Sequence, residues 1–148
     1  MASIFTSKSH RISKLADVSI FRNLPKKELA AVESHVTPLT IKAGTTLATQ
    51  DRAPHQFVLL VSGEAKVVRN GRKIATVGPG DAIGELSLLD GGAQTASVVT
   101  TTDCEVLAVS VPEFNALLLD SPQFSRNLLK SVAGRVRSTL TAAEAAHH

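Results

Sequence analysis

Between Thr37 and Val111 the sequence is a succession of short apolar segments separated by turn residues, and this pattern limits the possible folds more than any other feature. The segments have the lengths and apolar patterns of strands: TLATQ, QFVLLVSGEAKVV, KIATVG, TASVVTTT and EVLAVSV. Asn70 and Gly71 separate two of them, and a two-residue type I′ turn needs the positive φ that Asn-Gly readily adopts. Strands spaced by about 8–12 residues with turns between them predict a small all-β barrel or sandwich over residues 37–111.

Helical patterns flank this β region on both sides. Residues 24–36 carry apolar side chains at helical spacing, with Pro25 near the first turn. Residues 112–146 divide into a short helix and a longer one, which has Ser121 as its N-cap and Pro122 at its first position. The longer helix carries one apolar stripe, which we expect to be buried against the barrel: Phe124, Leu128, Val132, Val136 and Leu140.

The length of 148 residues fits one domain with one hydrophobic core. We assign residues 1–14 to a polar N-terminal tail, because the opening MASIFTSKSHRISKL lacks the apolar stretch of a secretory signal. The domain itself is expected over residues 15–146. His147 and His148 are consistent with the remnant of a purification tag and are given no role.

Composition limits the partners and the compartment expected for the chain. It contains no Trp, no Tyr and five Phe, which leaves few aromatic platforms for stacking nucleic acid bases. The formal net charge of +3 is spread along the chain, and no segment reaches the roughly 18 consecutive apolar residues of a membrane span. Cys104 is the single cysteine, so it forms no internal disulfide and fits a reducing compartment. We therefore expect a cytoplasmic protein, with Cys104 buried, that binds neither nucleic acid nor a membrane.

No catalytic or metal-binding constellation stands out in the sequence. His10, His35 and His55 are isolated, without the H-x-H pair and nearby carboxylate of a cupin-type metal site. The GPG turn after Val77 lacks the G-x-x-x-x-G-K-[ST] pattern of a phosphate-binding loop. We therefore expect a protein that is not an enzyme, with no catalytic residue, no metal and no cofactor.

Three segments follow one another over nearly the whole chain: SIFRNLPKKELAAVESHV, IKAGTTLATQDRAPHQFVLLVSGEAKVV and VGPGDAIGELSLLDGGAQTASVVT. Their motifs are F-x-x-L…L, then G-x-x-L…G, then G-D-x-x-G-E-L-x-L before a strand of small residues. From about Leu15 to Arg137 this order resembles the cyclic nucleotide-binding domain family, of the catabolite activator protein and protein kinase A regulatory subunit type. The resemblance implies a mainly β fold, a double-stranded β-helix or jelly-roll barrel with an N-terminal helix and a pair of C-terminal helices.

The segment GELSLLDG breaks the strand rhythm and is interpreted as a single helical turn between strands. In the family this turn opens a phosphate-binding cassette, where backbone N–H groups at a helix start bind an anion. The resemblance implies that Gly84 admits a close backbone approach and that Glu85 accepts a hydrogen bond from the ribose 2′-hydroxyl. It also implies that Leu86 and Ser87 offer backbone amides. A second interpretation of Glu85 stays open, since a negative charge near a helix start is favourable by itself.

One position departs from the family pattern, in which an arginine pairs with the cyclic phosphate and is followed by small residues. Gln94 stands at that position, and the small residues Thr95 and Ala96 complete the predicted ligand contacts. Glutamine carries no charge and lacks the guanidinium fork, and a charge-assisted hydrogen bond contributes about 1.5–3 kcal/mol. The loss of that bond alone corresponds to about 10- to 100-fold weaker binding. The sequence does not decide whether another basic residue reaches the cassette: Arg52, Lys66, Arg69, Arg72 or Lys73.

Two functions stay open at this point. The first is a sensor that binds a cyclic nucleotide, with adenosine 3′,5′-monophosphate (cAMP) as the expected ligand, and moves the C-terminal helix in response. The second is a degenerate domain that keeps the fold, does not bind the nucleotide and acts through a protein partner. Gly84 and Glu85 favour the first function, and Gln94 favours the second.

The C-terminal helix also predicts a homodimer, through an approximate a/d seam: Leu129, Val132, Val136 and Thr139 or Leu140. The alternative is that this amphipathic helix packs only on its own barrel. The chain ends about where the helix-turn-helix domain of the family's transcription factors would begin, so we expect no DNA binding by that route. Whether the chain belongs to a longer regulator stays open.

Overall fold

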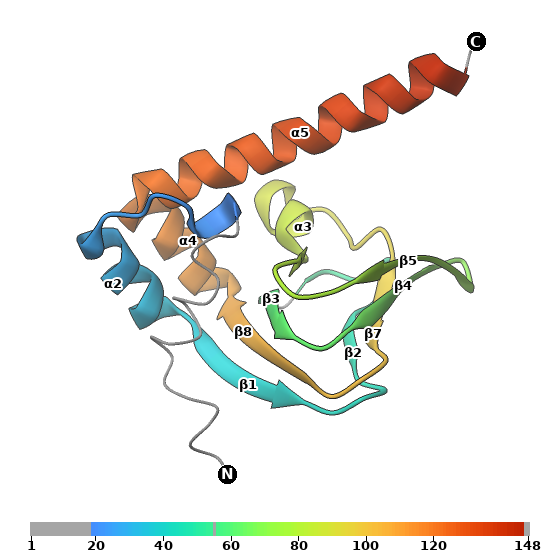
Figure 1. The fold of residues 1–148 in the computed structure, drawn as a ribbon, viewed down its shortest axis with the longest axis horizontal. Coiled ribbons are helices and arrows are strands. Elements are labelled where there is room, and N and C mark those ends of the chain that lie inside the picture. The colour runs from blue at the N-terminus through green and yellow to red at the C-terminus, as the bar shows by residue number, and fades with distance from the viewer. Residues whose placement is uncertain (1–18, 55, 147–148) are drawn as a thin grey trace.

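The computed structural model of the chain describes residues 19–54 and 56–146, with only the backbone described at Ser19, Glu85, Leu86, Leu88, Ala145 and Ala146. Within these residues the strands pair into two four-stranded antiparallel sheets (Figure 1). One sheet has the order β1-β8-β3-β6, with strands Thr37–Ile41, Cys104–Ser110, Gln56–Ser62 and Ala82–Ile83. The other has the order β2-β7-β4-β5, with strands Thr46–Ala48, Ser97–Thr100, Ala65–Arg69 and Arg72–Val77. This arrangement confirms the predicted mainly β fold of jelly-roll type.

The β4–β5 hairpin forms where Asn70 and Gly71 predict it. Their φ angles are 52° and 79°, as a type I′ turn requires, and Arg69 pairs with Arg72 across the turn. The side chain of Gln50, in the loop after β2, holds the turn through two hydrogen bonds. Its Nε2 donates to Asn70 Oδ1 at 2.8 Å, and its Oε1 accepts from the Asn70 amide at 2.9 Å. The tip of the hairpin is therefore attached to the β2–β3 loop.

Strands β3 and β8 are buried on both faces, which explains their continuous apolar sequences. Because side chains alternate across a strand, Phe57 and Leu59 pack toward the helices, while Val58 and Leu60 pack between the sheets. Cys104 belongs to the layer between the sheets and is 1% exposed, which confirms the predicted buried thiol.

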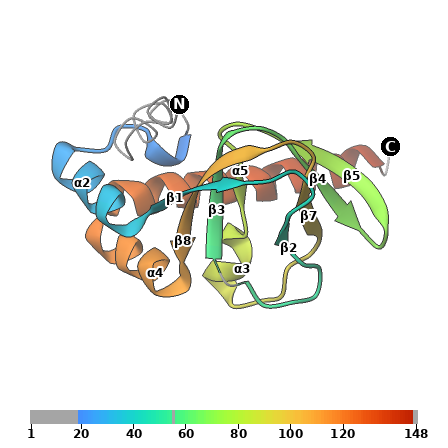
Figure 2. The same ribbon diagram turned by 90° about the horizontal axis from the view of Figure 1, so that it is seen from below.

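The helices lie mostly at one end of the sheets, as Figure 2 shows for α2 and α4. Their bounds are Ser19–Phe21 for the 3-10 helix η2, Lys26–His35 for α2, Glu85–Asp90 for α3, Val111–Asp120 for α4 and Pro122–Ala146 for α5. Helix α2 begins two residues after the predicted start because Pro25 is its extended N-cap, with ψ 156°. Helix α3 is the single short helix predicted between strands, whereas the sequence patterns did not indicate η2. The predicted tail over residues 1–14 lies outside the described residues, as do His147 and His148.

The start of α5 is held by its own N-cap and by one side chain of α2. Ser121 acts as the predicted N-cap, because its Oγ accepts a hydrogen bond from the Phe124 amide at 3.2 Å. Glu28 of α2 accepts from Ser121 Oγ at 2.7 Å and from the Gln123 amide at 2.8 Å. This carboxylate satisfies donors at the positive end of the helix, where a negative charge is favourable.

The apolar stripe of α5 is buried along only part of its length. Phe124 and Leu128 are 1% and 2% exposed, but Val136 and Leu140 are 55% and 59% exposed. The prediction that the whole stripe packs against the barrel is therefore wrong for its second half. The physical reason is the path of the helix, because the C-terminal half of α5, a helix of 25 residues, rises away from the sheets (Figure 1).

Candidate ligand-binding site

The backbone at the start of α3 strongly favours glycine at position 84. Gly84 has φ +93°, a left-handed conformation that side chains rarely adopt. A Cβ atom added there would also lie 3.1 Å from the Gln56 carbonyl oxygen and 3.3 Å from Gln94 Nε2. Gly84 therefore lets β3, the start of α3 and the side chain of Gln94 approach one another closely.

The side chain of Gln94 folds back into the cassette. Ser87, on α3, is 6% exposed, and its Oγ lies 3.3 Å from Gln94 Oε1 and 3.3 Å from the Ala93 carbonyl oxygen. The hydroxyl can donate its proton to one of these oxygens at a time. Thus the neutral amide at the position of the family's arginine packs between Gly84 and Ser87.

The cassette forms one wall of a cavity of about 210 Å³ beside α5. Strands β4 and β5 supply Val67 and Val77, and α5 supplies Arg135. The predicted site residues in its lining are Gly84, Ser87, Gln94, Thr95 and Ala96. The structure therefore brings these residues together, although their part in ligand binding stays a prediction. The backbone of Glu85 and Leu86 lies in the same cassette, in the first turn of α3.

Arg135 is a residue of this site that the sequence analysis missed. It lines both the cassette cavity and a neighbouring apolar groove of about 250 Å³ along α5. The groove is otherwise lined by Val132, Val136, Thr139 and Leu140. In the sequence, Arg135 lies on the same face of the predicted helix as Val132 and Val136. The sequence does not show that this face approaches the cassette, because that depends on the path of α5 in the folded domain.

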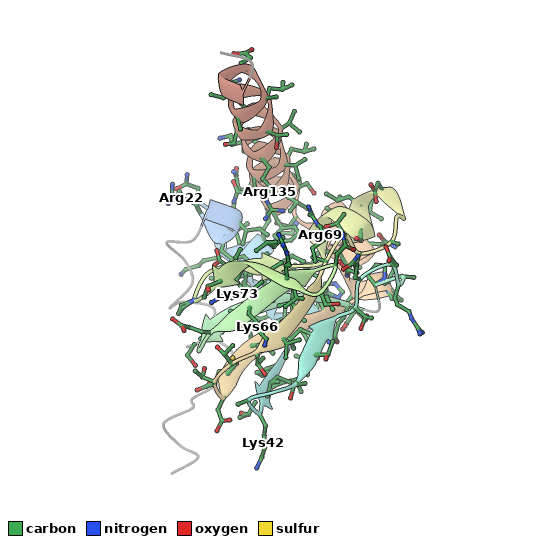
Figure 3. The ribbon with its side chains drawn as sticks, turned by 90° about the vertical axis from the view of Figure 1, so that its right-hand side faces the viewer. Arg22, Lys42, Lys66, Arg69, Lys73 and Arg135 are labelled. Carbon is green, nitrogen blue, oxygen red and sulfur yellow. The ribbon has the colours of Figure 1, made fainter. Side chains whose placement is uncertain are left out.

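Among the basic residues named from the sequence, Arg69 reaches the cassette. Its Nε donates to the Thr95 carbonyl oxygen at 3.3 Å, next to Gln94 in the chain. In Figure 3 Arg69 lies on the β4–β5 side of the domain and Arg135 above it on α5. The sequence left this question open, because the hairpin and the cassette are far apart along the chain.

Gln94 also borders a second cavity, of about 350 Å³, on the side of the β2–β3 loop. The backbone of Gln94 donates to the Arg52 carbonyl oxygen at 2.9 Å and accepts from the Asp51 amide at 2.8 Å. Arg52 lines this second cavity together with Gln56 and residues of β2. Arg52 is therefore held next to Gln94 by a backbone hydrogen bond, and both residues border this second cavity.

The described residues hold no group of three or more His, Cys, Asp or Glu side chains arranged to bind a metal. His35 contacts Asp120 at 3.2 Å, while His10 and His55 lie outside the part of the chain that the structure describes. Within that part, no helix combines the length and the apolar character needed to cross a bilayer.

Comparisons with known proteins agree with this geometry. The chain is 28% identical over 130 residues to a CRP-like cAMP-activated global transcriptional regulator of Mycobacterium tuberculosis, covering 84% of this chain and 58% of that protein. It is 31% identical over 116 residues to a cAMP-dependent protein kinase regulatory subunit of Schizosaccharomyces pombe, covering 78% of this chain and 28% of that one. The chain thus spans less than two thirds of the length of these relatives.

Solved structures show the same architecture. The catabolite activator protein of Thermus thermophilus superposes with a TM-score of 0.77 at 29% identity, over 85% of this chain and 62% of that one. The regulatory domain of Toxoplasma gondii PKA with cAMP superposes with a TM-score of 0.66 at 29% identity, over 74% and 44% of the two chains. The family model described as the cyclic nucleotide-binding domain matches residues 38–121, which is more than half of the chain. The chain belongs to the cyclic nucleotide-binding domain family.

Proposed function

We propose that this domain is a regulatory module that binds a cyclic nucleotide, with cAMP as the first candidate, in the cavity between the cassette and α5. The observation that carries the proposal is the convergence of the cassette and α5 on this cavity. Gly84, Ser87 and Thr95 line it from one side, and Arg135 lines it from the other. Relatives with this domain are named as cAMP-activated and cAMP-dependent regulators.

The cassette offers hydrogen-bond donors to an anionic group. The first backbone amides of α3 have no acceptor within the helix, as at the start of any α-helix. The left-handed Gly84 permits a close approach of backbone to ligand at this point. The cavity alone is smaller than the roughly 300–1,000 Å³ of typical ligand pockets, but it meets the α5 groove at Arg135. A nucleotide would therefore place its phosphate at the cassette and extend along α5.

The same geometry supports a response of α5 to the ligand. The beginning of α5 is anchored by Phe124 and Leu128 in the core, whereas its second half lies largely exposed beyond the cavity. A ligand in contact with both the cassette and Arg135 would bind one position of the helix better than others. Such a difference in affinity is what shifts a conformational equilibrium. In this proposal α5 carries the signal away from the site.

The proposal is tested by calorimetric titration of the chain with cAMP, the guanosine analogue and linear AMP. We expect saturable binding of a cyclic form only, with a Kd on the order of micromolar. A ligand at about 100 times its Kd should also stabilise the fold by about 2.7 kcal/mol, which thermal unfolding detects. If neither cyclic nucleotide gives heat or raises Tm at millimolar concentration, the proposal fails. The domain would then be the degenerate form that acts through protein contacts.

We further expect a second copy of the chain to cover the exposed face of α5. Val136 and Leu140 are 55% and 59% exposed and lie in line on one face of this helix. The double substitution Val136→Glu and Leu140→Glu should convert a dimer into a monomer in light scattering after size exclusion, because it places charges in the apolar seam. The matched control is Leu119→Glu on α4, which is 84% exposed. A monomeric wild type at high concentration, or equal dissociation of the control, contradicts the prediction.

A further inference from the structure

A phosphate in the cassette cavity needs a positive charge that position 94 does not supply. Gln94 is neutral, and its amide lies against Ser87, with Oε1 at 3.3 Å from Ser87 Oγ. Placing an anion in a partly enclosed site without a partner charge is costly. The replacement charge must therefore come from another element that reaches the cassette.

Arg69 lies on the face of β4 that looks toward this cavity. Side chains alternate along a strand, so Ala65, Val67 and Arg69 share one face. Ala65 is fully buried and Val67 lines the cavity. The register shift in the β4–β5 ladder lies in β5, where Val67 pairs with Ala75 and Val68 with Lys73, and β4 pairs regularly with β7. The alternation along β4 is therefore unbroken up to Arg69.

The guanidinium of Arg69 lies next to the cassette, and only one of its nitrogens forms a hydrogen bond there. Its Nε donates to the Thr95 carbonyl oxygen at 3.3 Å, one residue beyond Gln94. That bond leaves the donors of both terminal amino groups for an anion, in the planar arrangement that suits a phosphate. Among the described residues, no carboxylate forms a salt bridge with Arg69. Arg69 is exposed, so the approach of a ligand does not require a buried charge to be rearranged.

The hairpin that carries Arg69 is tied to the same loop as Gln94. The side chain of Gln50 binds Asn70, the residue after Arg69, through hydrogen bonds of 2.8 and 2.9 Å. The next residue of that loop, Asp51, donates its amide to the Gln94 carbonyl oxygen at 2.8 Å. The β2–β3 loop therefore holds the hairpin tip and the cassette in register, and Arg69 is kept near the site before a ligand arrives.

We propose that Arg69 replaces the missing cassette arginine and holds the anionic phosphate of the ligand from the β4–β5 hairpin. This inference rests on the proposed cyclic nucleotide binding. It assigns recognition of the phosphate to Arg69, whereas Arg135 belongs to the α5 wall of the cavity. The ligand is accordingly a nucleotide, and its phosphate contacts both the cassette and the β4–β5 hairpin.

The test compares Arg69→Gln with wild type in calorimetric titrations with cAMP and with adenosine, which lacks the phosphate. The variant should bind cAMP at least about 10-fold more weakly, as expected for the loss of a charge-assisted hydrogen bond, and should bind adenosine as wild type does. Arg69→Lys keeps the charge without the fork and should recover part of the affinity. Because the contact is ionic, the affinity of wild type for cAMP should also fall more steeply with added salt than that of Arg69→Gln.

The matched control is Lys73→Gln, which removes the same charge from the same hairpin. Lys73 pairs with Val68, so it lies on the opposite face of the ladder from Arg69, and it is exposed. We expect this variant to lose less than about threefold in affinity. Thermal unfolding of each variant verifies that the fold is intact.

The outcomes separate this inference from the function on which it rests. If wild type binds cAMP and Arg69→Gln weakens it no more than Lys73→Gln does, the role of Arg69 is overturned while the function stands. If Arg69→Gln weakens cAMP and adenosine equally, Arg69 only supports the Thr95 segment, and the inference is again overturned. If wild type binds no cyclic nucleotide, the proposed function itself fails, and with it the inference.

Discussion

Phe114→Ala is expected to lower the free energy of unfolding by about 3–5 kcal/mol, a large fraction of the roughly 5–15 kcal/mol that stabilises a typical domain. Phe114 of α4 is fully buried, and its ring lies 5.5 Å from Phe57 of β3 and 6.3 Å from Phe124 of α5. The substitution leaves a cavity where the sheet and two helices meet. Urea denaturation followed by circular dichroism measures the change.

Two further variants serve as controls for Phe114→Ala. Leu119→Ala on the same helix removes an 84% exposed side chain and should change the free energy of unfolding by less than about 0.5 kcal/mol. Phe114→Leu fills much of the space and should cost less than Phe114→Ala. A loss of under about 1 kcal/mol for Phe114→Ala would mean that the three rings do not pack together at the junction of the sheet and the two helices.

Gln94→Arg is expected to tighten the binding of cAMP by about 10- to 100-fold, because it restores a charge-assisted hydrogen bond at the cassette. The longer side chain must extend into the cavity, since Gln94 Nε2 already lies 3.3 Å from where a Cβ on Gly84 would be. Ser87 keeps the Ala93 carbonyl oxygen as an acceptor at 3.3 Å after the substitution. Calorimetric titration with cAMP measures the gain.

The neutral variant Gln94→Met serves as the control for Gln94→Arg, since it changes the side chain without adding a charge. In the Gln94→Arg background, Arg69→Gln should weaken cAMP binding less than it does in wild type. The reason is that the contributions of two arginines that contact the same phosphate to the binding free energy are not additive. An affinity for cAMP that Gln94→Arg leaves unchanged would show that the phosphate does not lie near position 94.

Local sequence patterns predicted most elements of the fold with small errors at their ends, but η2, β1 and β6 were not among the predicted segments. The Asn70-Gly71 turn and the Ser121 N-cap depend on residues close in the chain, and both were confirmed with the expected geometry. Pro25 was placed inside the predicted helix and is its N-cap instead. The ends of helices depend on the conformation of one residue, which periodicity does not determine.

The candidate site was only partly predictable. Gly84, Ser87, Gln94, Thr95 and Ala96 follow one another within a short stretch of chain, so a motif could name them together. Arg135 and Arg69 reach the same region from a helix and a hairpin that are distant in sequence. No local sequence pattern predicts which face of α5 or β4 approaches the cassette.

By itself the sequence determined the alternation of strands and turns and the flanking helices, because each of these depends on the conformational preferences of neighbouring residues, whereas the cassette was named from its resemblance to a family motif. The tertiary structure alone decided which basic side chains reach the cassette and how much of α5 is buried. Phe124 and Leu128 are buried but Val136 is 55% exposed, although all three continue one stripe in the sequence. Burial depends on the direction in which α5 leaves the sheets (Figure 1), and that direction is set by the packing of the whole domain.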